Sequence, residues 1–329
     1  MSNSSNLSTK AVFFPKTTFL AWLHAFLVIG FLIVVLNLAT IVIFVINRHL
    51  RRRSVYCLIN LAVADMLHGI LHLTESLIII GEYKGLIHDL VYRNIMYIFF
   101  DISLALSLFS LVLVSLDRVY ATYFPFEHRT TRLRKYCAVF AITSVLSISI
   151  VIIHNFVLRG QALQVFSVLF IFSLYFLCLI IIFTSYSAIF IKVKIEAKRL
   201  QPNQQQTAAI QIRQKREHHL AMTLFIATVL SLITWLPFVA GRITEKITTN
   251  RISYTVRFIL ILIQRTNSLI NPIIYVFGMG DFRKALTRLI FKCSREQRQI
   301  HAIGNHGNQL ARWQSRAPKG SSLQQEEHS

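Results

Sequence analysis

Blocks of about 20 or more mainly apolar residues recur along this chain, and a helix of that length spans the hydrocarbon core of a bilayer. Seven such blocks lie near residues 19–46, 54–81, 91–116, 137–158, 163–192, 220–240 and 253–277. With 54% of its residues hydrophobic and only 15% charged, the chain has more apolar surface than a soluble domain can cover. We therefore expect an all-α membrane protein, a seven-transmembrane helix bundle.

Most of the 35 lysines and arginines lie in the first, third and fifth connections between these blocks and in the tail. The positive-inside rule then predicts that these segments are cytosolic and that the N-terminus is extracellular. The sequons "NSS" at Asn3 and "NLS" at Asn6 lie on the predicted outer side, so these asparagines are expected to carry glycans. The expected location is the plasma membrane, as a multi-pass protein.

Four segments follow from this pattern: an extracellular N-terminus over 1–18, the bundle over 19–277, an amphipathic helix over 280–293 and a disordered cytosolic tail over 294–329. Cys293 follows the amphipathic stretch "DFRKALTRLIFK" directly after the last span. A cysteine in that position is an expected site of S-palmitoylation.

The formal net charge of +21 would also suit a nucleic-acid-binding protein. The basic residues, however, stand beside the predicted spans, where they meet anionic lipids of the inner leaflet. We therefore expect the lipid bilayer as a partner, and no nucleic acid.

Hydrophilic side chains occur inside four of the predicted spans, at similar depths counted from the cytosolic ends. A central charged residue costs about 2.5–3.5 kcal/mol in a bilayer, so these side chains should face the protein interior. They are Asn37, Asp65, Ser107, Asn267, Ser268 and Asn271. The one carboxylate, Asp65, needs a proton, a cation or several hydrogen-bond donors. A sodium ion at Asp65 or a network of water would meet that need; the alternative is a hydrogen-bond cluster that only ties the helices together.

Two prolines interrupt the last two spans, Pro237 in "ITWLPF" and Pro272 in "NSLINPIIY". Each removes one backbone donor and bends its helix, and nearby polar groups or water can satisfy the freed carbonyl. Two bent spans can act as pivots between two shapes of similar energy.

An adjacent acid and base, Asp117 and Arg118 in "SLDRVYATYFPF", close the third span. Arg118 can bond to Asp117 or to a carboxylate on another helix, and Glu217 in "KREHHLAM" opens the sixth span at the same face. An Arg118–Glu217 pair would be worth about 1 kcal/mol, which suits a switch. The alternative is an interfacial arginine paired with lipid phosphate.

At this point the chain resembles a class A (rhodopsin-like) G-protein-coupled receptor over roughly residues 19–293. The motifs that carry the resemblance stand in the family's order and spacing: Asn37, "NLAVAD" ending at Asp65, "DRV" from Asp117, Pro125, Tyr186, "TWLP" from Thr234, "NPIIY" ending at Tyr275, and "FRKAL". The resemblance implies a receptor, not an enzyme, that binds an extracellular or membrane-borne ligand. It also implies activation of heterotrimeric G proteins by helix rearrangement, with arrestin as a further partner.

By the same resemblance, the six polar residues of the spans match the family's sodium and water site. Trp235 matches the tryptophan below the ligand pocket. Arg118, Tyr186 and Tyr275 match residues that rearrange on activation and meet the G protein. Phe126, after Pro125, matches the apolar residue that docks into a groove of the G protein.

Several features of the family are absent from the sequence. Arg93 stands where the family usually has a cysteine at the outer end of the third span, and the short second outer loop has no cysteine. Ser144 and Cys178 replace the fourth-span tryptophan and the fifth-span proline. In this respect the chain is similar to melanocortin, cannabinoid and lysophospholipid receptors.

Five residues are expected to contact the ligand: Glu75, Phe100, Asp101, Trp235 and Arg265. Phe100 stands at the position of the aspartate of aminergic receptors, and Asp101 lies about 100° further round the helix, so a monoamine is not expected. Arg265 stands where opsins carry the lysine that binds retinal, and an arginine cannot form that Schiff base. Arg265 either pairs with an internal acid or anchors an anionic group of the ligand. The ligand itself could be a small molecule, a lipid or a peptide, and a lipid or a peptide is favoured.

Two histidines, His68 and His72, share a face of the second span because they are four residues apart. They could bind zinc, but packed neutral histidines are the favoured interpretation.

A different class of function, a seven-span transporter or channel, would predict inverted repeats or two corresponding broken helices. The sequence has no such internal similarity.

Overall fold

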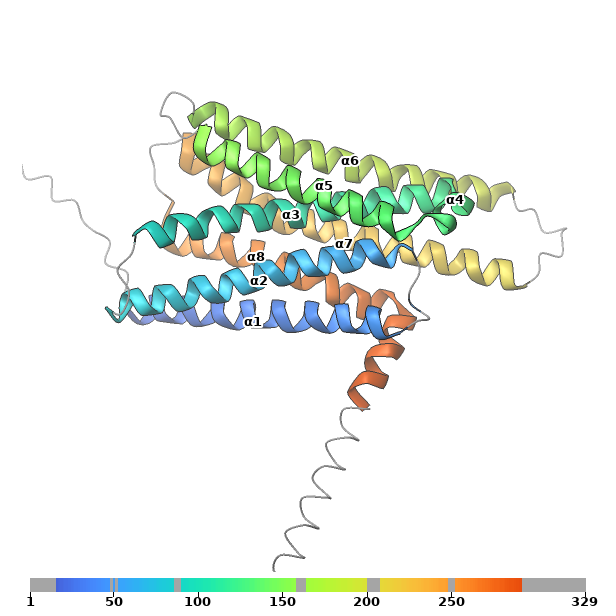
Figure 1. The fold of residues 1–329 in the computed structure, drawn as a ribbon, viewed down its shortest axis with the longest axis horizontal. Coiled ribbons are helices and arrows are strands. Elements are labelled where there is room, and N and C mark those ends of the chain that lie inside the picture. The colour runs from blue at the N-terminus through green and yellow to red at the C-terminus, as the bar shows by residue number, and fades with distance from the viewer. Residues whose placement is uncertain are drawn as a thin grey trace, which may run out of the picture. The chain divides into compact units, whose positions relative to one another are not determined.

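The computed structural model describes residues 16–47, 50, 53–85, 90–157, 164–199, 208–247 and 252–291, and these are almost entirely helical (Figure 1). The helices, in chain order, are α1 (Lys16–Ile46), α2 (Val55–Tyr83), α3 (Leu90–Tyr123), α4 (Pro125–Thr130), α5 (Leu133–Ile152), α6 (Gln164–Arg199), α7 (Ala208–Ile247) and α8 (Tyr254–Gly278). A π-helical segment, Ile153–Val157, continues α5. No strand occurs within the described ranges.

Seven of these helices, α1, α2, α3, α5, α6, α7 and α8, are long and apolar enough to cross a membrane. This confirms the predicted seven-helix membrane fold. The sequence pattern did not predict α4, a short helix between the third and fourth spans that begins with Pro125 in its first turn. Proline suits that position because the first helical N–H groups have no intrahelical partner.

Several span boundaries differ from those predicted, and the two beside the third connection have a clear physical cause. The third span extends to Tyr123, beyond the predicted end near residue 116, and the fourth begins at Leu133, before the predicted start near 137. Hydropathy detects the hydrocarbon-facing part of a helix, whereas these ends carry polar residues that are buried by contacts within the protein. Asp117, Arg118 and Tyr136 are such residues, each at most 8% exposed.

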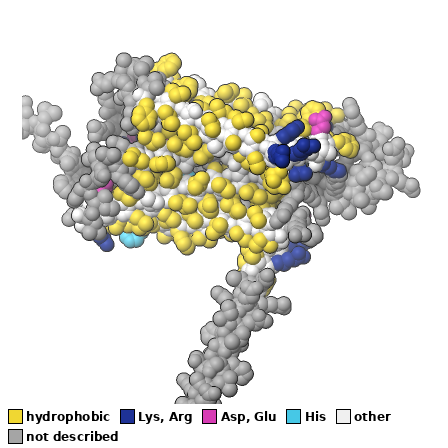
Figure 2. Space-filling view, viewed as in Figure 1, with side chains coloured by type: hydrophobic (Ala, Val, Ile, Leu, Met, Phe, Trp, Pro, Cys, Tyr) yellow, Lys and Arg dark blue, Asp and Glu magenta, His cyan; other side chains and the backbone are white. Residues whose placement is uncertain are grey.

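The helices pack around an interior that is polar at several levels, while their outer surfaces are apolar. Ile142 and Val145 of α5, for example, are 59% and 62% exposed, as expected for side chains that face lipid. Figure 2 shows apolar side chains along the length of the bundle and several Lys and Arg side chains gathered beside α4. Close approach of α1 and α2 depends on Gly69, where a Cβ atom would lie 2.7 Å from Cγ2 of Ile33.

The C-terminal part contains a further helical stretch over residues 280–291, within the predicted amphipathic helix over 280–293. The chain divides into two compact units, Met1–Arg283 and Lys284–Ser329. The predicted N-terminal segment 1–18 lies almost wholly outside the described residues, and the predicted tail 294–329 lies wholly outside them.

Candidate functional site

The carboxylate of Asp65 is completely buried at the centre of the bundle and accepts three hydrogen bonds. Its Oδ1 accepts from the hydroxyl of Ser107 on α3 at 2.8 Å and from the hydroxyl of Ser268 on α8 at 2.9 Å. Its Oδ2 accepts from the amide of Asn271, also on α8, at 2.9 Å. The carboxylate on α2 therefore joins three helices.

A fourth helix, α1, reaches this cluster through Asn37. Its amide donates to the backbone carbonyl of Ser268 at 3.0 Å and to that of Ile33 at 3.0 Å. Three amide oxygens here, on Asn37, Asn267 and Asn271, are buried and have no hydrogen-bond donor. All six polar residues predicted from the spans are buried.

This set of oxygens is chemically suited to a hard cation, because carboxylates and amide carbonyls are the ligands that such ions prefer. It comprises the Asp65 carboxylate and the amide oxygen of Asn271 beside it, and the amide oxygens of Asn37 and Asn267 are also buried without donors on α1 and α8. The described residues contain no group of three or more His, Cys, Asp or Glu side chains that could hold a metal ion. The residues present therefore fit a sodium ion or ordered water.

At the Asp117 end of the bundle, which the distribution of basic residues predicts to be cytosolic, Asp117 has three partners. Arg118 NH2 donates to its Oδ2 at 2.6 Å, and the Tyr136 hydroxyl donates to its Oδ1 at 2.9 Å. His128 Nε2 lies 3.0 Å from the same Oδ1 and donates to it, since a carboxylate only accepts. Arg118 is therefore paired with its neighbour, the first of the two partners considered from the sequence.

Sequence reasoning missed His128 and Tyr136. The sequence did contain a signal for His128, because Pro125 predicts the start of a helical turn. In such a turn, the residue three positions later, His128, lies on the same side of the helix as Pro125. The side chain of Glu217, the second partner considered for Arg118, lies outside the described residues.

Around Arg118, further predicted switch residues lie on α6, α7 and α8. The hydroxyl of Tyr186 on α6 accepts from Thr228 of α7 at 3.4 Å. The ring of Tyr275 on α8 is buried between Phe44 and Phe282, with ring centroids 6.0 Å from each. The hydroxyl of Thr223 on α7 donates to the backbone carbonyl of Gly278 on α8 at 3.2 Å.

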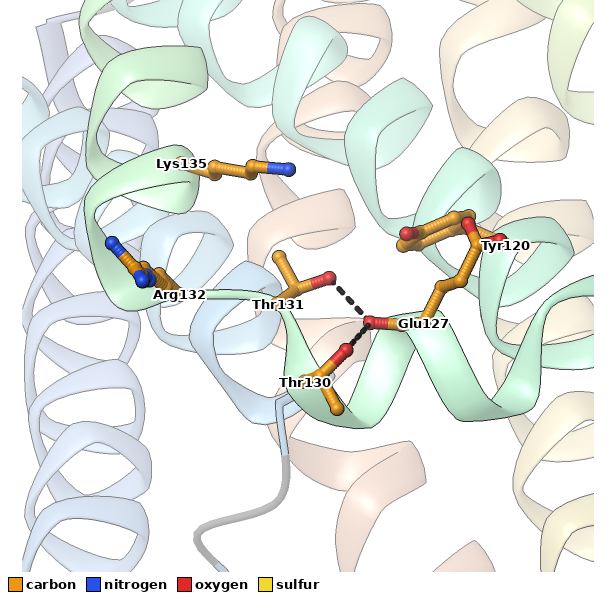
Figure 3. A pocket seen from close by; sticks show the side chains of 6 residues that line it. All are labelled: Tyr120, Glu127, Thr130, Thr131, Arg132 and Lys135. Carbon is orange, nitrogen blue, oxygen red and sulfur yellow. Dashed lines mark hydrogen bonds between the residues drawn. The ribbon is translucent and has the colours of Figure 1, made fainter.

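The exposed side chains of this end include Phe126, which is 81% exposed on α4. Beside it lies a groove of about 410 Å³ lined by Tyr120, Glu127, Thr130, Thr131, Arg132 and Lys135 (Figure 3). Lys135 extends toward Tyr120 across the groove, and the hydroxyls of Thr130 and Thr131 donate to the backbone carbonyl of Glu127. The surface here offers an apolar side chain next to charged and hydroxyl groups.

The opposite end of the bundle, the Arg265 end, contains an ion pair between the buried Arg265 of α8 and the partly exposed Glu75 of α2. Arg265 NH2 donates to Glu75 Oε2 at 2.6 Å, and the guanidinium lies 4.2 Å from the centroid of the Phe26 ring. The structure thus has the internal pair, one of the two roles expected for Arg265. Two of its nitrogens, Nε and NH1, are buried without an acceptor.

The other expected ligand residues do not all point to the same place. Phe100 is buried against His72, with ring centroids 4.7 Å apart, and Trp235 stacks on Tyr175 at 5.5 Å. Asp101 of α3 instead faces Asn155 of the π-helical segment that continues α5, whose amide donates to it at 3.4 Å. Its carboxylate therefore lies apart from the Arg265–Glu75 pair.

Both prolines expected to act as pivots lie inside continuous helices, Pro237 in α7 and Pro272 in α8. Pro272 is next to Asn271, so the missing backbone donor and the Asp65 cluster occupy the same turn of α8. Asn3, Asn6 and Cys293, the predicted modification sites, lie outside the described residues.

Comparison with known proteins identifies relatives along most of the chain. The family model "7 transmembrane receptor (rhodopsin family)" matches residues 36–275. The human histamine H2 receptor is 28% identical over 304 residues, which cover 86% of this chain and 82% of the receptor. Mouse trace amine-associated receptor 5 is 29% identical over 255 residues, covering 71% of this chain and 74% of that protein. Among solved structures, that of squid rhodopsin has a TM-score of 0.71 at 17% identity, over 84% of this chain and 86% of that one.

Proposed function

The chain belongs to the rhodopsin family of seven-transmembrane receptors and is a G-protein-coupled receptor, and on that premise we propose how it receives and transmits a signal. The N-terminus is extracellular, the Arg265 end of the bundle receives the ligand, and the Asp117 end faces the cytosol at the plasma membrane. The excess of basic residues in the connections at the Asp117 end supports this orientation.

The observation that carries the mechanism is that α8 makes contacts with other helices at three levels of the bundle. Arg265 of α8 pairs with α2, Asn271 bonds Asp65 at the centre, and Tyr275 packs on α1 near the Asp117 end. A change at one end of this helix therefore has a route to the other. Because Asn271 directly precedes Pro272, the hinge of α8 lies beside the Asn271–Asp65 hydrogen bond, which can exchange partners when the helix bends.

At the cytosolic end, activation separates α7 from α8 and changes the partners of Arg118. The Thr223–Gly278 hydrogen bond and the Tyr186–Thr228 contact are the interactions that α7 must break or rearrange. The G protein then docks at this end, and Phe126 beside the 410 Å³ groove is the apolar anchor. Arrestin uses the same face of the receptor.

The proposed ligand is a lipid or peptide with an anionic group rather than a monoamine, although two relatives are named for histamine and trace amines. An amine needs an unpaired carboxylate in the pocket, whereas Glu75 is paired with Arg265 and Asp101 faces Asn155. Arg265 offers two nitrogens, Nε and Nη1, whose N–H groups have no acceptor, and such donors suit an anion. A sodium ion at Asp65 acts as an allosteric modulator that stabilises the resting form.

The test is nucleotide exchange on a purified heterotrimeric G protein, with the receptor in lipid nanodiscs and a panel of lipids, peptides and amines. At least one compound should accelerate exchange, and Arg118→Ala should abolish that acceleration while the receptor stays folded. Acceleration by amines alone, unaffected by Arg265→Gln, would contradict the ligand class. If no compound changes exchange and the protein instead transports solutes into liposomes, the receptor mechanism is wrong.

A further inference from the structure

A chain of hydrogen bonds at the Arg265 end fixes which nitrogen of each buried histidine carries a proton. The Ser103 hydroxyl donates its only hydrogen to the backbone carbonyl of Phe100 at 2.8 Å. The same hydroxyl lies 2.8 Å from Nδ1 of His68, so it must accept a hydrogen bond there. His68 therefore has its proton on Nδ1, and its Nε2 is an acceptor when the ring is neutral.

The tautomer of His72 follows from that of His68. The Nε2 atoms of the two rings are 2.8 Å apart, and since that of His68 accepts, that of His72 donates. A neutral His72 is then left with a bare lone pair on Nδ1. This atom is buried, has no hydrogen-bond partner, and lies 3.6 Å from Oε2 of Glu75. Two groups that can only accept hydrogen bonds thus face each other.

The same carboxylate oxygen is the one that Arg265 holds, at 2.6 Å. In the part of the chain that the structure describes, the charged and titratable groups around His72 are His68 and Glu75 on its own helix and Arg265 on α8. The packed side chains from the other helices are uncharged: Phe100 and Ser103 on α3, and Phe26 of α1 against Arg265. His72 Nδ1 and the guanidinium of Arg265 therefore face the same oxygen atom of Glu75, from two different helices.

We propose that His72 is a proton-binding site of this receptor, and that uptake of a proton at Nδ1 forms an ion pair with Glu75 and releases Arg265. With neutral histidines, the charges of Glu75 and Arg265 cancel. A proton on His72 with Arg265 still in place would leave a net positive charge in a buried site, which costs desolvation energy. Uptake of the proton and departure of Arg265 are therefore one coupled event.

This coupling makes acid a second input to the receptor, and the inference rests on the proposed function for its signalling consequence. Arg265 released from Glu75 brings its unpaired Nε and NH1 to an anionic ligand group. An anion that draws Arg265 away in turn favours protonation of His72, because coupling between two binding sites is reciprocal. Protons at the extracellular end and an anionic ligand thus act synergistically.

The proton site is tested first without any G protein. The full receptor, with isotope-labelled histidine, is placed in phosphatidylcholine nanodiscs and followed by NMR over about pH 5 to 8, where histidine titrates. The signal that His72→Gln removes belongs to His72, and it should gain a proton on Nδ1 as the pH falls. A His72 signal that stays neutral throughout overturns the proposal, as does one whose titration is unchanged in Glu75→Gln.

The coupling is tested by G-protein nucleotide exchange over the same pH range. Exchange by the unmodified receptor should rise about threefold or more on acidification, while His72→Gln should remove this dependence. His24→Gln is the matched control, because His24 is exposed on α1 and bonds only its own helix. Equal pH profiles for the unmodified receptor and His72→Gln overturn the coupling. If His72 titrates but no exchange occurs at any pH, the proton site stands and the proposed signalling function fails.

Discussion

Each end of the bundle places an acid beside a buried arginine, but the two ends satisfy these charges to different degrees. At one end Asp117 has three donors, Arg118, His128 and Tyr136, and neither carboxylate oxygen lacks a partner. At the other end Arg265 has one acceptor for its guanidinium and keeps two unpaired nitrogens, and Glu75 is 23% exposed. A saturated charge resists rearrangement, whereas an incompletely paired one has alternatives of similar energy.

This difference suits a receptor in which the ion pair at the Arg265 end rearranges readily when a ligand binds. The hydrogen bonds at the Asp117 end then change only when the helices around them move. The Asp65 cluster between them is intermediate, since its carboxylate is fully bonded but three neighbouring amide oxygens lack donors. The following predictions test this gradient, starting from the end where the largest effect is expected.

Asp117→Ala should have the largest effect, because it leaves the guanidinium of Arg118 and the groups of His128 and Tyr136 buried without their acceptor. Removing one partner of a buried pair costs about 3–5 kcal/mol. We expect a much lower melting temperature and raised ligand-independent nucleotide exchange, measured on the same purified sample. Glu127→Gln is the control for the melting temperature, because Glu127 is exposed on the neighbouring helix α4. If the variant has the same melting temperature and the same ligand-independent exchange as the unmodified receptor, the hydrogen bonds of Asp117 do not stabilise the resting form.

Gly278→Ala should have the next largest effect, at the contact where α7 meets α8. A Cβ atom at residue 278 would overlap the side chain of Thr223, which also bonds the carbonyl of Gly278. Overpacking of this kind costs about 1–3 kcal/mol unless the helices separate. If α7 moves away on activation, the variant should exchange nucleotide faster without ligand.

Gly280→Ala is the matched control for that experiment, since a Cβ atom there meets nothing within 4 Å. It should leave basal exchange unchanged. Equal effects of the two substitutions would show that the change is not caused by the α7–α8 contact.

Much of this arrangement was predictable from the sequence, and the reason is the bilayer. Because hydrocarbon penalises exposed polar groups, Asp65 and its neighbours had to face the interior, and counting residues from the span ends placed them at one depth. Seven spans followed directly from hydropathy.

What the sequence did not predict depends on contacts between distant segments. Nothing in the pattern around Ser103 indicates that its hydroxyl would fix the proton on His68, because the two lie on different helices. Asn155 as the partner of Asp101 depends on how α5 continues into its π-helical segment. The extension of α3 to Tyr123 was missed because buried polar residues lower the hydropathy of a span without ending its helix.

Asp65→Asn should have an intermediate effect and should reveal the proposed sodium ion. An ion that binds only the folded receptor stabilises it by mass action, by about 1–2 kcal/mol at a concentration some tenfold or more above its dissociation constant. The unmodified receptor should therefore melt at a higher temperature in sodium chloride than in choline chloride at equal ionic strength. Asp65→Asn, which is close in shape but uncharged, should melt at the same temperature in both salts. Asp101→Asn is the control, because Asp101 faces Asn155 rather than the cluster. A sodium effect that survives in Asp65→Asn would favour a purely structural hydrogen-bond cluster at this level.

Arg265→Gln should have the smallest effect on stability, and it decides whether the two ends really differ. The substitution leaves Glu75 without its cation, but that carboxylate is partly exposed and His72 Nδ1 lies 3.6 Å away, ready to donate once protonated. The expected loss is about 1 kcal/mol, within the range of partly exposed ion pairs. It should shrink further as the pH is lowered, because the proton on His72 replaces the lost charge. Melting temperatures of Arg265→Gln and of the double variant with His72→Gln, measured across about pH 5 to 8, provide the check. Arg265→Gln could instead lower the stability of the receptor as much as Asp117→Ala at every pH. The ion pair at the Arg265 end would then be as strongly held as that at the Asp117 end, and the proposed difference between the two ends would be wrong.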